Sequence, residues 1–106
     1  MTWLRVCNVA DLSEGSGTRF EITGDTTVAL FTVDGEVFAV NDRCSHAEAS
    51  LSEGDVFGCE VECPRHGAAF NLSTGEPLTL PATVPLATYD VRIEDGAVSI
   101  NVGEAV

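Results

Sequence analysis

Short apolar runs alternate with polar residues and turn signals along almost the whole chain of 106 residues. Alternation with a period of two favours β-strands that bury one face. We expect eight strands, at Trp3–Cys7, Thr18–Ile22, Thr27–Val33, Glu36–Val40, Asp55–Glu62, Ala69–Leu72, Ala87–Ile93 and Ala97–Val102. No segment carries a sustained helical stripe, and single helical turns are expected at most at Val9–Leu12 and Ala47–Leu51. This pattern predicts one all-β domain over residues 1–106, a small sandwich or barrel.

The turns between these strands are well marked. Asp34-Gly35 and Asp95-Gly96 are Asp-Gly pairs flanked by apolar residues, a strong hairpin signal. The longest apolar run is only Val28-Ala29-Leu30-Phe31, which suits a buried strand and is too short to span a membrane. The first residues, MTWLRVCNVADL, lack the basic and apolar regions of a signal peptide. We therefore expect a cytoplasmic protein without a membrane segment.

Charge narrows the range of partners. Seventeen Asp and Glu residues against five Arg residues give a net charge of -12. Such a surface repels the phosphates of nucleic acid. It would speed encounter with a protein that carries a basic patch, although an acidic surface that serves only solubility explains the charge equally well.

Two short motifs carry the candidate chemistry. Cys44-x-His46 is followed, after sixteen residues, by Cys63-x-x-His66, and the chain has no other histidine. Asn41-Asp42-Arg43 and Cys63-Pro64 each end a predicted strand, because Pro64 has no amide to donate to a ladder. Both pairs are therefore expected in loops, where two thiolates and two imidazoles suit a tetrahedral metal or an iron–sulfur cluster. A zinc finger usually groups like ligands before a helix, whereas here each loop holds one of each kind, as a binuclear centre would need.

The C-x-H and C-x-x-H motifs, with chain length and β-rich pattern, resemble the small Rieske-type ferredoxins. The resemblance covers essentially the whole chain, including WLRVCNVADL, NDRCSH, CPRHG, FNLSTG and LPATVPL. It implies antiparallel sheets in which a small cluster-binding subdomain, about residues 42–72, is inserted in a larger β base domain. It also implies one [2Fe–2S] cluster per chain, with Cys44 and Cys63 on the inner iron and His46 and His66 on the outer iron. Neutral imidazoles in place of two thiolates raise the potential to about −150 to +300 mV, against roughly −400 mV for plant-type ferredoxins.

Departures from the Rieske pattern of respiratory complexes are informative. Those proteins carry an extra Cys in each loop, joined as a disulfide, where this chain has Ala49 or its neighbours and Arg65. They also place Ser and Tyr hydroxyls after the second histidine, where this chain has Ala68 and Phe70. Fewer hydrogen-bond donors stabilise the reduced state less, so we expect a potential near the low end of the range.

Other residues near the motifs have simpler interpretations. Cys7 and Cys59 are expected as small core residues, the latter in phase with Phe57 and Val61 on one strand. Gly67 is either a turn glycine or a close approach behind His66, and residues 81–85 resemble the proline loop that covers Rieske clusters. Arg43 and Arg65 are expected to be mainly structural. Five carboxylates between the motifs are expected on a solvated face, at Glu48, Glu53, Asp55, Glu60 and Glu62.

No histidine remains for acid–base catalysis, so we expect an electron carrier rather than an enzyme. The resemblance implies the monomeric ferredoxin of a bacterial multicomponent aromatic-ring dioxygenase. Its transient partners would be a flavin-containing NAD(P)H reductase and the terminal oxygenase. Two alternatives stay open: a Rieske-like small subunit of a nitrite reductase or similar complex, and a structural zinc-binding interaction module.

Overall fold

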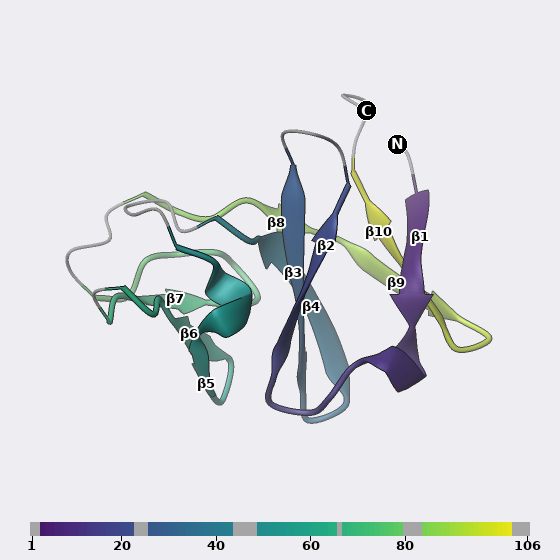
Figure 1. Ribbon diagram of the computed structural model, residues 1–106, viewed down its shortest axis with the longest axis horizontal. Coiled ribbons are helices and arrows are strands. Elements are labelled where there is room, and N and C mark those ends of the chain that lie inside the picture. The colour runs from purple at the N-terminus through teal and green to yellow at the C-terminus, as the bar shows by residue number, and fades with distance from the viewer. Residues whose placement is uncertain (1–2, 23–25, 44–48, 66, 80–83, 103–106) are drawn as a thin grey trace.

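The computed structural model describes residues 3–22, 26–43, 49–65, 67–79 and 84–102. Three antiparallel sheets account for nearly all of its regular structure (Figure 1). Their strands are β1 (Trp3–Asn8), β2 (Gly17–Glu21), β3 (Thr27–Val33), β4 (Glu36–Asn41), β5 (Asp55–Phe57), β6 (Glu60–Glu62), β7 (Ala69–Asn71), β8 (Thr88–Tyr89), β9 (Val91–Glu94) and β10 (Ala97–Asn101). The all-β prediction is confirmed.

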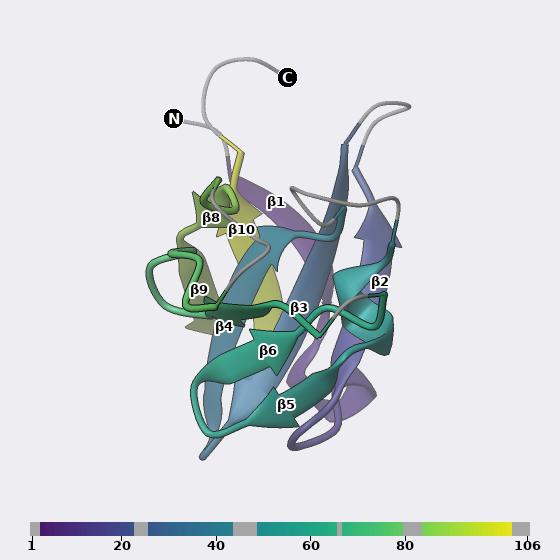
Figure 2. The ribbon, with the colours of Figure 1, turned by 90° about the vertical axis from the view of Figure 1, so that its left-hand side faces the viewer.

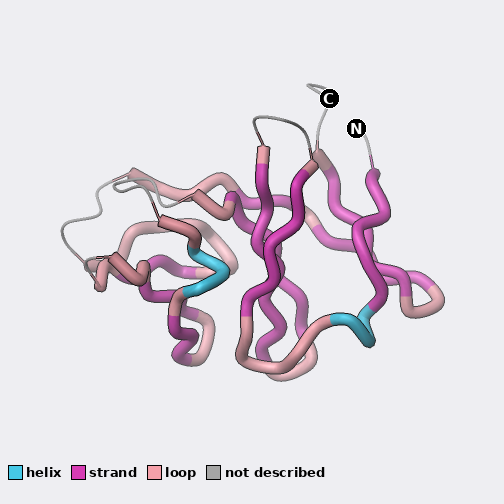
Figure 3. The backbone as a smooth tube through the Cα atoms, in the orientation of Figure 1, coloured by secondary structure: helices cyan, strands magenta, loops and turns pink. Residues whose placement is uncertain are grey.

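Each sheet has a simple strand order, and the strands of the third sheet lie in sequence between strands of the central sheet. One has the order β1-β10-β9, the central one β2-β3-β4-β8, and the third β5-β6-β7 (Figures 1 and 2). The third sheet is a contiguous piece of chain between β4 and β8, and it lies at one end of the molecule. Two single 3-10 turns, η1 (Val9–Asp11) and η2 (Leu51–Glu53), are the helical elements of the described chain (Figure 3).

The central sheet is buried on both of its faces. Side chains alternate along β3, so that Val28 and Leu30 face one core cluster, and Ala29 and Phe31 face the other. The first cluster is completed by Cys7, Val37, Ala39, Val98 and Ile100. The second joins β3 and β4 to the third sheet and to η2, through Val40, Leu51, Val61, Cys63, Ala68, Phe70, Leu72 and Leu86. The continuous apolar run of β3 follows from this double burial.

Both Asp-Gly hairpin turns are confirmed. Asp34 and Gly35 have φ of 52° and 80°, and Asp95 and Gly96 have φ of 51° and 79°. Two successive residues with positive φ are typical of the type I′ turn, whose twist matches that of the flanking strands. These turns join β3 to β4 and β9 to β10.

Three predictions for local structure are wrong. The run Asp55–Glu62 is two strands, β5 and β6, paired across a turn at Gly58 and Cys59, with Gly58 at φ 60°. Ala87–Ile93 likewise divides into β8 and β9, which belong to different sheets. The helical turn expected at Ala47–Leu51 begins only at Leu51, with residues 47 and 48 outside the described part, whereas the turn at Val9 is confirmed.

The turn at Gly58 also corrects the placement of Cys59. This residue lies in the turn and not on a strand, and it is half-buried against the second core cluster. Its supposed neighbour on the same face, Phe57, is 59% exposed. Cys7 is buried as predicted. In the described residues no helix has the length and apolar character needed to cross a membrane.

Candidate metal centre

The first ligand loop, residues 43–49, is closed at its base by backbone and side-chain contacts. Strand β4 ends at Asn41, as predicted, and an isolated antiparallel bridge then joins Arg43 to Ser50. The amide of Leu51 donates to the carbonyl of Asp42 at 2.7 Å. The Asp42 carboxylate accepts from Ser50 Oγ at 2.6 Å and from the Ser52 amide at 2.9 Å. The two ends of the loop are therefore held side by side.

The second ligand loop, residues 64–67, is closed in a similar way. Strand β6 ends at Glu62, and the amide of Cys63 donates to the carbonyl of Ala68 at 2.7 Å. The amide of Gly67 donates back to the carbonyl of Cys63 at 3.0 Å. Gly67 has φ of 73°, and a Cβ there would meet only Glu62 side-chain atoms at 3.7 Å and beyond. The glycine thus supplies a left-handed turn, and not a close approach of the backbone.

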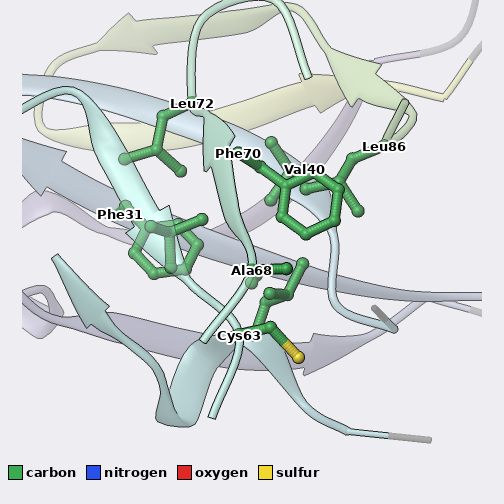
Figure 4. Packing of buried hydrophobic residues seen from close by; sticks show 10 residues of the cluster. Phe31, Val40, Cys63, Ala68, Phe70, Leu72 and Leu86 are labelled. Atoms are coloured by element: carbon green, nitrogen blue, oxygen red, sulfur yellow. The ribbon is translucent and has the colours of Figure 1, made fainter. Parts of the chain in front are cut away.

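Both loop bases contribute side chains to the same core cluster. Leu51 follows the first loop, while Cys63 and Ala68 flank the second, and all three are at most 1% exposed. Figure 4 shows the Cys63 sulfur on the side of the cluster away from Leu72 and Leu86. Sixteen residues separate His46 from Cys63 in the sequence. The bases of the two loops nevertheless pack into the same core cluster.

A third segment, residues 77–79, is hydrogen-bonded to β7, next to the base of the second loop. Pro77 forms an isolated bridge with Phe70, and the amide of Leu78 donates to the carbonyl of Ala69. Thr79 Oγ1 accepts from the Ala69 amide at 2.9 Å. At its far end, Leu86 donates to the carbonyl of Gly75 at 2.8 Å. The predicted covering segment, residues 81–85, lies between these anchors, with residues 81–83 outside the described part.

Of the four predicted ligands, the structure describes Cys63. Cys44, His46 and His66 lie outside the described residues, so their convergence stays a prediction. Cys63 is a free thiol at the end of β6. Arg65 is exposed, and Arg43 is exposed beside the bridge to Ser50. Glu53, Asp55 and Glu60 are exposed and Glu62 is half-buried, which agrees with a solvated acidic face, while Glu48 lies outside the described part.

Sequence reasoning missed the residues that hold the first loop. Asp42 stands out in the sequence only as the end of a strand. In the structure it is 3% exposed, and its carboxylate accepts hydrogen bonds from Ser50 Oγ and the Ser52 amide. Its spacing from Ser50 and Ser52 gives no recognised motif. The available sequence signal for this contact was an Asp directly after an apolar strand and two serines after the ligand loop.

The residues described here fit a Rieske-type [2Fe–2S] cluster. Such a cluster needs two thiolates and two imidazoles from two loops that converge. The structure supplies one buried thiol, not joined in a disulfide within the described residues, at the base of one loop and brings the base of the other loop against the same core. A disulfide between the loops is absent from the described residues, since Ala49 and Arg65 stand at the relevant positions.

Comparison with known proteins agrees with this arrangement. The family model for the Rieske [2Fe-2S] domain matches residues 2–90. The 3-phenylpropionate/cinnamic acid dioxygenase ferredoxin subunit of Photorhabdus laumondii is 51% identical over 105 residues, which cover 98% of each chain.

Solved structures have the same fold. The Sphingomonas yanoikuyae B1 ferredoxin matches with a TM-score of 0.90 and 37% identity, over 96% of this chain and 100% of that one. A chain in the complex of reduced oxygenase and oxidised ferredoxin of carbazole 1,9a-dioxygenase also gives 0.90, with 38% identity over 98% and 96% of the two chains. A protein described as the small subunit of an NADPH nitrite reductase is more distant, with 0.83 and 28% over 96% and 100%.

The closed loop bases, the thiol of Cys63 and the full-length similarity agree with one another. The protein is an electron carrier with a Rieske-type [2Fe–2S] cofactor, and the chain belongs to the Rieske [2Fe–2S] family, among the ferredoxins of dioxygenase systems.

Proposed function

We propose that this protein accepts one electron from a flavin-containing NAD(P)H reductase and delivers it to the terminal oxygenase of a multicomponent aromatic-ring dioxygenase. The observation that carries the proposal is the 51% identity, over 98% of both chains, with a dioxygenase ferredoxin subunit. That relative's name refers to 3-phenylpropionate and cinnamic acid, so an oxygenase for arylpropanoic acids is the first partner to test.

Four side chains would hold the cofactor. Cys44 and Cys63 would bind the inner iron, and His46 and His66 the outer iron, as the resemblance of the motifs to those of Rieske proteins implies. When bound, the cluster supplies a one-electron couple whose potential is raised because two neutral imidazoles replace thiolates. The free thiol of Cys63 and the closed bases of both loops support this assignment.

The division of labour within the chain is also proposed. Residues 42–72 would form the cluster-binding subdomain and the remainder the base domain. Support comes from the separate β5-β6-β7 sheet, which packs on the central sheet. Its strands β5 and β6 lie between the two loops in sequence, and β7 follows the second loop. We further propose that the protein acts as a cytoplasmic monomer, free to meet two partners in turn.

Replacement of the ligands tests the assignment. H46A and H66A should abolish the rhombic paramagnetic signal of the dithionite-reduced protein, and C63S should abolish cluster iron. C59S removes a half-buried thiol two residues after the end of β5 and serves as the matched control, because it should keep the full iron content. Full cluster content in H46A or H66A would contradict the proposal.

Partner reduction tests the function itself. Purified ferredoxin should restore NADH-dependent product formation to a reductase and an arylpropanoate oxygenase, and H66A should not. If the native protein instead elutes as a permanent complex with a larger chain, the nitrite-reductase type of subunit is supported. A colourless protein that contains zinc would support the structural module.

A further inference from the structure

Asp42 is the one buried charged side chain in the described part of the protein. It directly follows β4 and precedes the proposed ligand Cys44 by two residues. Its backbone is fixed on both sides, because its amide donates to the carbonyl of Thr27 at 2.9 Å and its carbonyl accepts from Leu51 at 2.7 Å. The residue therefore joins the central sheet to the far end of the first ligand loop.

Burying a carboxylate is costly unless hydrogen bonds replace its hydration. Ser50 Oγ donates to Asp42 Oδ2 at 2.6 Å, and the Ser52 amide donates to Oδ1 at 2.9 Å. Ser50 and Ser52 also share a hydroxyl–hydroxyl contact of 2.8 Å. Hydrogen bonds to an ionised group are shorter and stronger than neutral ones, so this set can hold the loop end firmly.

Arg19, on β2, adds a cation near the Asp42 carboxylate. Its Nε lies 3.6 Å from Asp42 Oδ2, while its guanidinium also lies 3.8 Å from Glu21 on the same strand, β2. Half of the Arg19 side chain is exposed, so solvent screens this pair and it contributes little by itself. The hydroxyl of Ser50, which precedes η2, and the amide of Ser52, within η2, are thus the main partners of the Asp42 carboxylate.

We infer that Asp42, Ser50 and Ser52 form a clamp that positions the first ligand loop for cluster binding, and that Asp42 adds a fixed negative charge behind that loop. The inference rests on the ligand assignment proposed above. The clamp joins the two ends of the loop that contains Cys44 and His46 through contacts among described residues. A buried charge is screened much less than a surface one, so the carboxylate also disfavours an added electron at the cluster.

Three variants separate the clamp from the charge. S50A removes the hydroxyl donor and keeps the carboxylate. D42N keeps the size of the side chain and removes its charge. E21Q is the matched control, because it also removes one carboxylate that pairs with Arg19, but at a side chain that is 76% exposed.

Two readouts need no partner protein: the rate at which a chelator extracts iron from the oxidised protein, and the midpoint potential. Loss of one charge-assisted hydrogen bond corresponds to about tenfold in an equilibrium or rate. We therefore expect iron extraction to be about tenfold faster in S50A and D42N than in the wild type, and unchanged in E21Q. The midpoint potential should rise in D42N and stay unchanged in S50A and E21Q.

Extraction at the wild-type rate in S50A and D42N would overturn the clamp, and an unchanged potential in D42N would overturn the charge effect. If D42N does not accumulate as folded protein, extraction from S50A decides the clamp. Failure of the proposed function would show as a lack of partner reduction by the wild type, which neither of these readouts measures.

Discussion

Ala68 and Phe70 form the apolar wall directly behind the second ligand loop. Both are fully buried in the core cluster that contains Cys63. Neither side chain has a hydroxyl, so neither side chain can donate a hydrogen bond to the cluster or its ligands. A cofactor that gains negative charge on reduction is stabilised in that state by nearby donors. These two side chains therefore favour a low potential within the Rieske range.

A single hydroxyl at this wall tests that reasoning. A68S should raise the midpoint potential, since its hydroxyl would stand where a donor stabilises the reduced state. A69S, at the next residue and on the partly exposed side, is the control and should leave the potential unchanged. Redox titration followed by visible absorption measures both. A wild-type midpoint well above zero, or equal shifts in the two variants, would contradict the interpretation.

Cys7 gives stability a dependence on pH. Burial, and next the negative charge of Asp11, raise the pKa of its thiol above the ordinary value of 9.0, although Arg5 acts in the opposite direction. The thiolate is thus less favourable in the folded protein than in the unfolded chain. Stability from the neutral thiol is fully present below pH 9.0 and is lost as pH rises from there through the folded pKa.

The thermal midpoint should therefore fall more steeply above pH 9 in the wild type than in C7A, which has nothing to ionise at this position. A series of melts between pH 7 and 10.5, followed by circular dichroism, gives the two slopes. Parallel slopes would show that Cys7 does not contribute to the alkaline loss of stability.

At the level of elements, much of the fold could be predicted because local chemistry determined it. The Asp-Gly turns placed two hairpins, and the run Val28-Ala29-Leu30-Phe31 identified a strand buried on both faces. The β5–β6 hairpin was missed because apolar residues continue through its turn, and Gly58 was the one local signal. The division between β8 and β9 depends on which sheet each strand joins, which no local pattern encodes.

Gly75 lies at the contact between the turn after β7 and the segment before β8, where its carbonyl accepts from the Leu86 amide. It ends the turn after β7, where Asn71 Oδ1 accepts from the amides of Ser73 and Thr74. Its φ is 79°, and an added Cβ would lie 2.2 Å from the carbonyl oxygen of Leu86. Gly35 has nearly the same φ, 80°, with open space around it. Comparison of alanine substitutions at Gly35 and Gly75 therefore separates the cost of a positive φ from the cost of a steric contact.

G35A should cost about 1 kcal/mol, because only the positive φ opposes the side chain. G75A should cost about 3 kcal/mol, because backbone must also shift to relieve the contact. For a domain of this size each kcal/mol corresponds to about 4–8 °C in thermal midpoint. Thermal unfolding of both variants is the measurement, and a G75A midpoint no lower than that of G35A would argue against a tight junction with Leu86.

At the scale of the whole molecule, the metal motifs were predictable and their framework was not. Cys44, His46, Cys63 and His66 stand out by residue type and spacing alone. The residues that hold their loops come from η2, β7 and the segment before β8, and they meet only because the third sheet packs on the central one. Asp42 is the clearest example, since its partners lie eight and ten residues away.

The net charge of -12 gives a prediction for the encounter with the proposed reductase. If carboxylates steer the encounter, added salt should screen the attraction and slow reduction. Stopped-flow reduction by the reductase between about 10 mM and 500 mM ionic strength should show a monotonic fall in rate, because the Debye length shrinks from roughly 30 Å to a few ångströms. A rate independent of salt would mean that the acidic surface has no part in docking.

The central sheet has a consequence for attempts to miniaturise the protein. Strands β3 and β4 supply Ala29, Phe31 and Val40, which belong to the same core cluster as Leu51, Val61 and Phe70. A peptide of residues 42–72 alone would lack β3 and β4. Leu51, Val61 and Phe70 would then be exposed to water on the side that packs against those strands. We therefore expect that the proposed cluster-binding segment does not fold alone, and that its transfer to another protein needs a replacement for this apolar surface.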